Sequence, residues 1–142
     1  MQIVKENFMK STYIYLIGLF FLVCSVSVKC QLDSLEVLFL GNSFISKNYL
    51  PAIFQSLSNA QGKHPHVDNY TPLGYTLQQH SEDSITLDKI SMIDWDIIIL
   101  QEQGQIPSYD PGRDTLMYPY AVMLDSFIHA CHPCAKTLFF LT

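Results

Sequence analysis

The sequence predicts an α/β domain in which helices cover both faces of a parallel β-sheet. Short apolar runs rich in strand-forming residues alternate along the chain with amphipathic segments of helical spacing, in the order β-α-β-α-β-α-β. The run Ile97–Leu100 contains no polar residue, which is typical of a central strand buried on both faces. Because parallel strands are joined by helical crossovers, this alternation favours a parallel sheet over an antiparallel one.

The first half of the chain contains two predicted strands and the helix between them. Glu36–Leu40 (EVLFL) is an apolar run that ends at a Gly-Asn pair. Leu50–Ala60 has apolar residues at helical spacing, and Pro51 is tolerated in the first turn of a helix. Gly62 ends this helix, and His66–Tyr70 is predicted as a weaker second strand.

The second half repeats the alternation. Leu77–Ile90 is predicted as one amphipathic helix, and Trp95–Leu100 (WDIIIL) is the clearest strand. A loop rich in Gln, Gly and Pro follows over residues 101–112. Tyr118–Ala130 is predicted as the third helix and Leu138–Leu141 as the fourth strand. The order predicts a flavodoxin-like three-layer α/β/α fold, incomplete at about four strands.

The first thirty residues have the features of a targeting segment. A polar, basic start with Lys5 and Lys10 precedes the apolar stretch Tyr13–Val28, and small residues lie near its end. This stretch is short for a membrane span, which needs about 20 residues. We expect residues 1–30 to be a secretory signal peptide, with an uncleaved N-terminal anchor or lipid attachment at Cys24 as alternatives. The protein is then secreted or periplasmic, and it meets a membrane only through an uncleaved N-terminal segment.

The charge of the remaining chain restricts its partners. Residues 1–30 hold three of the eight basic and one of the thirteen acidic side chains, so residues 31–142 have a net charge of −7. Such a surface repels phosphate backbones, which argues against a nucleic-acid partner. It suits a secreted enzyme that acts on neutral substrates.

Cys131 and Cys134 form a Cys-His-Pro-Cys motif whose spacing is also found in redox proteins. In redox folds the pair follows a strand and opens a helix, whereas here it follows a predicted helix. We therefore expect a local disulfide or two free thiols. Only one such motif is present, and His64 and His66 have no evident third partner, so neither a metal nor a cofactor is predicted.

The carboxyl ends of the first three predicted strands are the expected ligand site, because α/β sheets bind ligands at that edge. The three strand-end segments are residues 41–44, residues 72–76 and residues 101–105. In the first segment, Ser43 follows a tight turn and is a nucleophile if a base removes its proton. The alternative is that Ser43 caps a helix and Asn42 makes a turn.

The second and third segments offer hydrogen-bond donors. In the second, Gly74 allows a backbone N–H to approach a ligand closely, or it is simply a turn glycine. In the third, the sequence Gln101-Glu102-Gln103-Gly104-Gln105 directly follows a buried strand. Backbone N–H groups and side-chain amides are the donors that stabilise an oxyanion in acyl transfer.

Together these segments resemble the SGNH (GDSL-like) hydrolases. VLFLGNSF at Val37–Phe44 is similar to the first block of that family, and Leu73–Thr76 to the second. WDIIILQEQ at Trp95–Gln103 lies where the third block, Gly-x-Asn-Asp, is found. With GYTLQQH at Gly74–His80, the chain looks most like an uncharacterised secreted bacterial branch in which Gln replaces the Asn. The resemblance covers Leu35–Thr142.

The resemblance implies a site residue by residue. Ser43 would be the nucleophile, and the backbone N–H groups of Ser43 and Gly74 would form two parts of the oxyanion hole. Either Gln103 or Gln105 would supply the third donor: a strict block alignment favours Gln105, whereas the QEQ pattern favours Gln103. The implied reaction is hydrolysis of a small-molecule or carbohydrate ester, possible substrates including acetyl esters of carbohydrates.

The family's Asp-x-x-His element, which carries the general base, does not occur in the 142 residues. We therefore expect a C-terminally truncated domain over residues 31–142 with little or no turnover. His80 is a candidate substitute base, but packing at the cleft rim is the favoured alternative. Two other functions stay open: a non-catalytic, glycan-binding or degenerate module of the same fold, and a fragment that does not fold.

Overall fold

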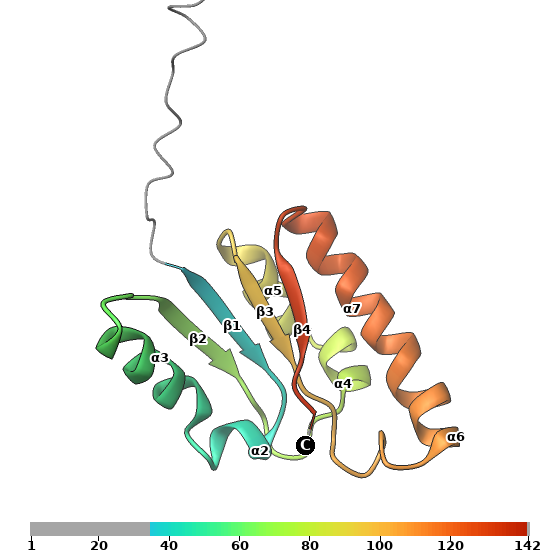
Figure 1. Cartoon of the computed structure of the whole chain (residues 1–142). Helices are drawn as coiled ribbons and strands as arrows, with labels where there is room; N and C mark the ends of the chain where they lie inside the picture. Colours follow the sequence, from blue (N-terminus) through green and yellow to red (C-terminus); the bar gives the residue numbers. More distant parts are fainter. Residues whose placement is uncertain (1–34, 142) are drawn as a thin grey trace, which may run out of the picture. The chain divides into compact units, whose positions relative to one another are not determined.

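The computed structural model describes residues 35–141, and these form a parallel four-stranded sheet with helices on both faces (Figure 1). This confirms the predicted α/β class. The strand order is β2-β1-β3-β4, and every neighbouring pair is parallel. The strands are β1 (Glu36–Leu40), β2 (His66–Tyr70), β3 (Ile97–Leu100) and β4 (Lys136–Phe139).

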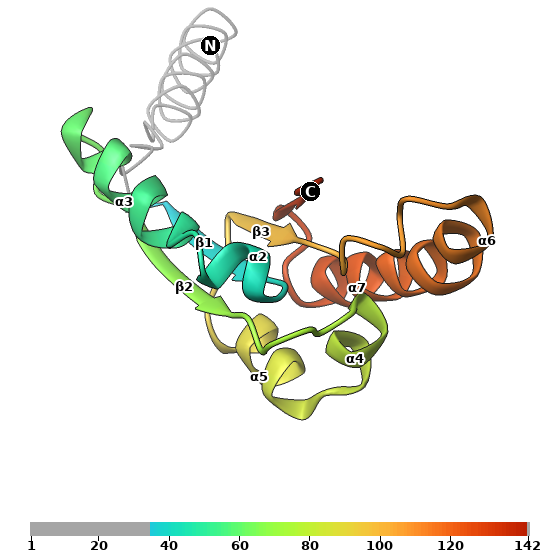
Figure 2. The same cartoon turned by 90° about the horizontal axis from the view of Figure 1, so that it is seen from below.

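Helices lie on both faces of the sheet (Figure 2), and the central strands β1 and β3 bury alternate residues on the two faces. On one face, Val37 and Phe39 of β1 pack with Ile45 of α2 (Ser43–Ser46) and with residues of α3 (Leu50–Ala60). On the other face, Leu38 and Leu40 join a larger cluster. That cluster includes residues of α4 (Leu77–Glu82), α5 (Ser84–Met92) and α7 (Tyr118–Cys131). The central strands β1 and β3 therefore lie in the core, as their apolar runs predict.

The predicted helix over Leu77–Ile90 is wrong in one respect, because it is two helices that meet at Asp83. Asp83 has extended backbone angles, and its carboxylate accepts a hydrogen bond from the N–H of Ile85 at 3.3 Å. A side chain that caps a new helix in this way ends the preceding one. The apolar spacing continues across the break, which explains why periodicity did not predict it.

Two predicted strands have different bounds in the structure. The third strand begins at Ile97 rather than Trp95. The fourth is Lys136–Phe139 rather than Leu138–Leu141, because the N–H of Lys136 already donates to the carbonyl of Asp96 at 2.9 Å. β4 is at the edge of the sheet, where polar residues are tolerated, so its apolar residues alone do not define its start.

The third predicted helix has an additional N-terminal part. α6 (Asp110–Gly112) runs into a π-helical turn over Arg113–Met117 and then into α7, which ends at Cys131 rather than Ala130. Pro119 in the first turn of α7 has no N–H to donate, and a wider turn before it is consistent with that missing donor.

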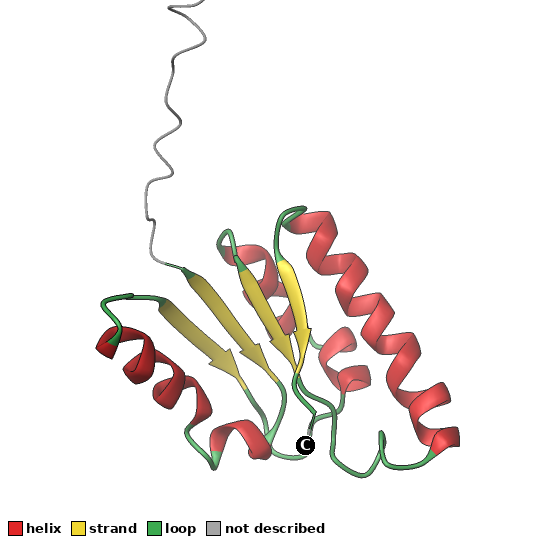
Figure 3. Ribbon diagram, in the orientation of Figure 1, coloured by secondary structure: helices red, strands yellow, loops and turns green. Residues whose placement is uncertain are grey.

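The carboxyl ends of the strands and the loops that follow them gather at one edge of the sheet, the lower edge in Figure 3. The predictions for residues 1–30 fall outside the described residues. Within residues 35–141, no helix combines the length and apolarity that a membrane span requires.

Candidate active site

Ser43 is the first residue of α2 and directly follows the turn after β1. The helix cap is Asn42, whose Oδ1 accepts a hydrogen bond from the N–H of Phe44 at 3.1 Å. The alternative in which Ser43 caps the helix is therefore wrong. The Ser43 side chain is half-buried, and its hydroxyl makes no hydrogen bond with any residue among 35–141.

Asn42 connects the first strand-end segment to both of the others. It is 1% exposed. Its backbone N–H donates to Oε1 of Gln101 at 3.0 Å, and its Nδ2 donates to the carbonyl of Tyr75 at 2.8 Å. Because buried hydrogen-bonding groups are costly to leave unpaired, these bonds hold the residue before Ser43 in one position.

Gly41 allows this arrangement because it has no side chain. A Cβ at position 41 would lie 2.7 Å from Oε1 of Gln101 and 2.8 Å from Cδ1 of Ile45. Gln101 is fully buried, and its Nε2 donates to the carbonyl of Glu102. The first glutamine of the third segment is thus part of the scaffold beneath the strand ends.

The second segment contains the predicted glycine in a turn. The N–H of Tyr75 donates to the carbonyl of Pro72 at 3.3 Å, and Gly74, with a φ of 73°, occupies the third position of that turn. A positive φ here favours glycine. Gly74 is exposed, and a Cβ added to it would meet no atom within 4 Å, so no other residue crowds this position of the turn.

Glu102 joins the third segment to Leu77, the first residue of α4, which directly follows the second segment. Its carboxylate is 4% exposed and accepts the N–H of Leu77, at 3.2 Å to Oε1 and 3.3 Å to Oε2. Oε1 also accepts the N–H of Gln103 at 2.6 Å. Burial raises the pKa of Glu102, and the hydrogen bonds from the two backbone N–H groups only partly oppose that rise.

These contacts form a closed triangle of side-chain hydrogen bonds among the three segments, the second segment being reached on one side through Leu77, the residue that directly follows it. Asn42 pairs with Gln101, Asn42 pairs with Tyr75, and Glu102 pairs with Leu77. Sequence reasoning placed the segments at one edge but missed Asn42, Tyr75 and Glu102 as their connections. The signal in the sequence that could have identified connecting residues is a polar residue directly next to a buried strand, since a buried polar group needs a hydrogen-bond partner.

The two candidate amides of the third segment differ in how they are held. Oε1 of Gln103 accepts the N–H of Gln105 at 2.9 Å, and the Gln103 side chain is half-buried. Because a backbone N–H needs an acceptor, this bond fixes the oxygen and leaves Nε2 of Gln103 as a donor. The side chain of Gln105 is exposed and has no hydrogen bond to another residue among 35–141.

His80 is buried below the site, and both of its ring nitrogens have partners. Nε2 lies 2.8 Å from the carbonyl of Gly41, to which it donates, and Nδ1 lies 2.9 Å from Oγ1 of Thr86. Burial lowers the pKa of His80, and the Gly41 carbonyl and Asp83 only partly oppose this. These contacts favour the packing alternative over a base for Ser43.

The other candidate sites lie apart from the three segments. Cys131 and Cys134 are free thiols at the C-terminal end of α7. Nδ1 of His66 pairs with Glu36, and no group of three His, Cys, Asp or Glu side chains within residues 35–141 is arranged to hold a metal.

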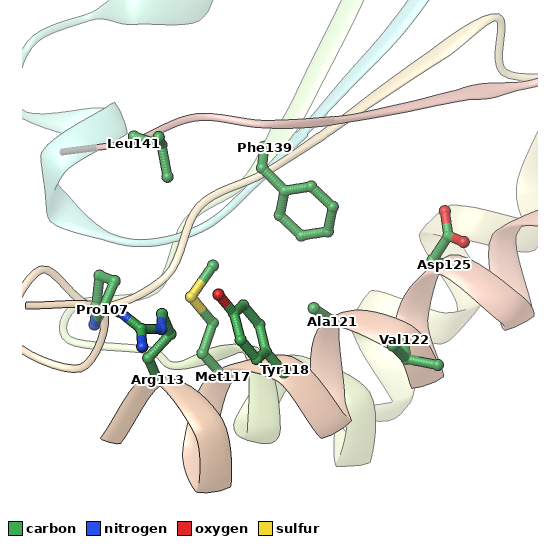
Figure 4. Close-up of a pocket in the computed structure, with 9 residues that line it drawn as sticks. All are labelled: Pro107, Arg113, Met117, Tyr118, Ala121, Val122, Asp125, Phe139 and Leu141. Carbon is green, nitrogen blue, oxygen red and sulfur yellow. The ribbon is translucent and has the colours of Figure 1, made fainter. Parts of the chain in front are cut away.

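An apolar pocket of about 600 Å³ lies between α7 and β4 (Figure 4). Phe139 and Leu141 line one side of it, and Met117, Tyr118 and Val122 line the other. Its lining includes none of the predicted site residues, so the pocket is separate from the candidate active site.

Comparison with known proteins supports the fold. No protein-family model matches the chain, and no curated protein is similar to it. The chain is similar to the crystal structure of a DUF4886 family protein from Bacteroides uniformis, with a TM-score of 0.62 and 16% identity. The match covers 75% of this chain and 49% of the other, so this chain spans about half the length of that protein. At this identity the similarity establishes the α/β fold alone.

Proposed function

We propose that the protein is a serine ester hydrolase in which Ser43 is the nucleophile. The observation that carries this proposal is the hydrogen-bonded triangle that ties the three strand-end segments together. It ties Asn42, the residue before Ser43, to the turn that contains Gly74 and to the polar loop after β3. The Ser43 side chain is half-buried, and its hydroxyl has no hydrogen-bond partner among residues 35–141. A nucleophile and its oxyanion donors require this kind of fixed arrangement.

In the proposed reaction, Oγ of Ser43 forms a bond to the acyl carbon of an ester and gives its proton to a base. The carbonyl oxygen becomes an oxyanion that accepts hydrogen bonds from the N–H groups of Ser43 and Gly74. Collapse of this intermediate breaks the ester C–O bond and releases the alcohol, which takes up the proton. Water then attacks the acyl-serine and releases the acid.

Gln103 is our choice for the third oxyanion donor. Its oxygen is held by the N–H of Gln105, so its Nε2 is oriented, whereas the Gln105 side chain would have to be ordered when the oxyanion forms. Donors that are already oriented stabilise a transition state at no cost of reorganisation. Gln105 remains the second candidate.

The general base is not supplied by His80 in this proposal, because Thr86 and Gly41 occupy its nitrogens. No Asp-x-x-His sequence is present in the 142 residues, and we propose that they have low turnover without an added base. We propose carbohydrate acetyl esters as substrates by analogy with the family that the motifs resemble, together with the secretion signal expected in residues 1–30.

Added imidazole tests the proposal because it replaces a missing histidine base. The rate of p-nitrophenyl acetate hydrolysis is measured against imidazole concentration for the wild type, Ser43→Ala and Ser46→Ala, since Ser46 is an exposed serine on the same helix. We expect a steeper dependence for the wild type and Ser46→Ala than for Ser43→Ala, which reports the background reaction. Equal slopes of rate against imidazole concentration for all three proteins would contradict the proposal. Saturable binding of an acetylated glycan would then favour the non-catalytic module.

A further inference from the structure

Glu102 is a buried acid whose carboxylate accepts the N–H groups of Gln103 and of Leu77, three residues after Gly74. We propose that Glu102 is a positioning residue, whose carboxylate holds the turn containing Gly74 against Gln103 so that both donors face one oxyanion. This inference rests on the proposed function, since it assigns a role in the same reaction.

Only a few residues separate the groups that the carboxylate binds from the two donors. Gln103 directly follows Glu102, and its backbone N–H lies 2.6 Å from Oε1. Leu77, whose N–H is shared by the two carboxylate oxygens, begins α4 three residues after Gly74. Leu77 is itself fully buried, so the turn cannot shift without moving a core residue.

Thr76, one of the two residues between Gly74 and Leu77, makes the connection to Gly74 stiffer. Thr76 caps α4: its hydroxyl accepts the N–H of Gln79 at 3.2 Å, and its own N–H donates to Oε1 of Gln79 at 3.0 Å. Such a reciprocal cap fixes the entry of the chain into the helix. A displacement of Leu77 therefore moves the turn that contains Gly74.

A carboxylate at this position is costly, which indicates that its geometry is needed. Glu102 makes no ion pair with a cationic side chain among residues 35–141. Burying an acid without a cation costs free energy of desolvation, which only its hydrogen bonds can offset. Here both oxygens accept, and burial raises the pKa of the group in the folded protein.

An amide reproduces only part of these contacts, because Oε1 accepts both N–H groups whereas Oε2 accepts only the N–H of Leu77. In Glu102→Gln one oxygen still accepts N–H groups, but the NH₂ group takes the other position, where the N–H of Leu77 is also a donor. Two donors that face each other push the turn away from the strand end. Glu102→Gln therefore tests position with almost no change in side-chain volume, and Glu82→Gln, the same change on the exposed surface of α4, is the matched control.

Amide hydrogen exchange measures the positioning itself. We expect Glu102→Gln to raise the exchange rates of the Leu77 and Gln103 N–H groups by about tenfold or more, since hydrogen bonds to a charged group are among the stronger ones. Glu82→Gln should leave both rates unchanged. Unchanged exchange in Glu102→Gln would overturn the inference, whatever the activity of the protein.

Covalent labelling of Ser43 by a fluorophosphonate measures how the position of the two donors affects the reactivity of Ser43. Oγ of Ser43 attacks phosphorus, and the P–F bond breaks with loss of fluoride. Added imidazole takes the proton of the hydroxyl. The phosphoryl oxygen of the reagent occupies the position of the oxyanion. We expect Glu102→Gln to slow labelling about a hundredfold, as a displacement of about 1 Å does in other enzymes. Combined with Gln103→Ala, it should slow labelling less than the product of the two single effects.

The outcomes separate this inference from the proposed function. Faster exchange with unchanged labelling of Ser43 would overturn the positioning role and leave Glu102 as a purely structural acid. A wild type that is not labelled at Ser43 would overturn the proposed function, and with it the role of Glu102 in the reaction. The exchange rates would then still show whether the carboxylate holds the two segments together.

Discussion

The backbone N–H of Asn42 donates a hydrogen bond to Oε1 of Gln101 at 3.0 Å, and both residues are buried. This bond joins the turn before Ser43 to the end of the central strand β3. It is one of three side-chain bonds that connect the strand-end segments, the third through Leu77 directly after the second segment.

Asn42→Ala should destabilise the protein by about 2 kcal/mol, because it removes the helix cap and leaves the carbonyl of Tyr75 without its donor. Asn42→Asp keeps the cap but places a carboxylate against that carbonyl, so it should also be destabilising. Urea unfolding followed by circular dichroism measures both free energies. Asn48→Ala is the control: it removes an exposed hydrogen bond to the carbonyl of Phe44 and should change stability by less than about 1 kcal/mol. Equal losses of stability in the two alanine variants would show that the buried bonds of Asn42 contribute no more than an exposed one.

Gly41→Ala should destabilise the protein by about 1–3 kcal/mol, because its new Cβ would lie 2.7 Å from Oε1 of Gln101. Gly62→Ala is the matched comparison: it has a φ of 74° and open space around it, so it should lose about 1 kcal/mol through backbone strain alone. Thermal unfolding of both variants checks the order. A smaller loss for Gly41→Ala than for Gly62→Ala would mean that Gln101 moves aside freely.

The buried His80 should make stability depend on pH. Its pKa in the folded protein lies below the ordinary value of 6.5, so the unfolded chain binds a proton first as the pH falls. The free energy of unfolding should therefore decrease from about pH 6.5 down to the folded pKa and then level off. The groups around the ring are Tyr70, Tyr75 and Thr86, with Asp83 beyond Thr86.

The comparison for this prediction is His80→Gln, which cannot titrate. Unfolding free energies of the wild type and the variant are measured by urea denaturation between pH 7.5 and pH 5. The difference between them should shrink as the pH falls, because only the wild type loses the contribution of a neutral buried histidine. A constant difference over this range would show that His80 titrates alike in the folded and unfolded states.

Gln103→Ala should reduce the rate of Ser43 labelling by a fluorophosphonate about a hundredfold, which is the usual effect of losing one oxyanion donor. Gln105→Ala should have a smaller effect, because the Gln105 side chain has no fixed orientation. The backbone N–H of residue 105, which orients Gln103, is retained in alanine. Rates are measured by intact-protein mass spectrometry. The reverse order of the two variants would identify Gln105 as the donor.

The sequence was sufficient to predict the layers of this fold. The apolar runs in β1 and β3 and the helical spacing of α3 depend on residues close together in the chain, and the structure has them as predicted. The break at Asp83 was not predicted, because a capping side chain does not disturb the apolar spacing on either side. The start of β4 was not predicted because a backbone bond from Lys136 to Asp96 sets it.

The candidate site was predictable only in outline. The rule that ligands bind where parallel strands end locates the three segments. The resemblance to the SGNH hydrolases singles out Ser43, Gly74 and one of Gln103 and Gln105 within them. The bonds from Asn42 to Gln101 and from Leu77 to Glu102 join residues 59 and 25 positions apart, and no local pattern specifies such pairs. The preference for Gln103 over Gln105 likewise depends on a contact that only the folded chain has.

The central claim is that Ser43 is a nucleophile. The most direct test is to treat the protein with a fluorophosphonate in the presence of imidazole and to map the adduct by peptide mass spectrometry. We predict one adduct on Ser43, none on the exposed Ser46, and no adduct on this helix in Ser43→Ala. Equal labelling of Ser43 and Ser46, or none on either, would contradict the claim.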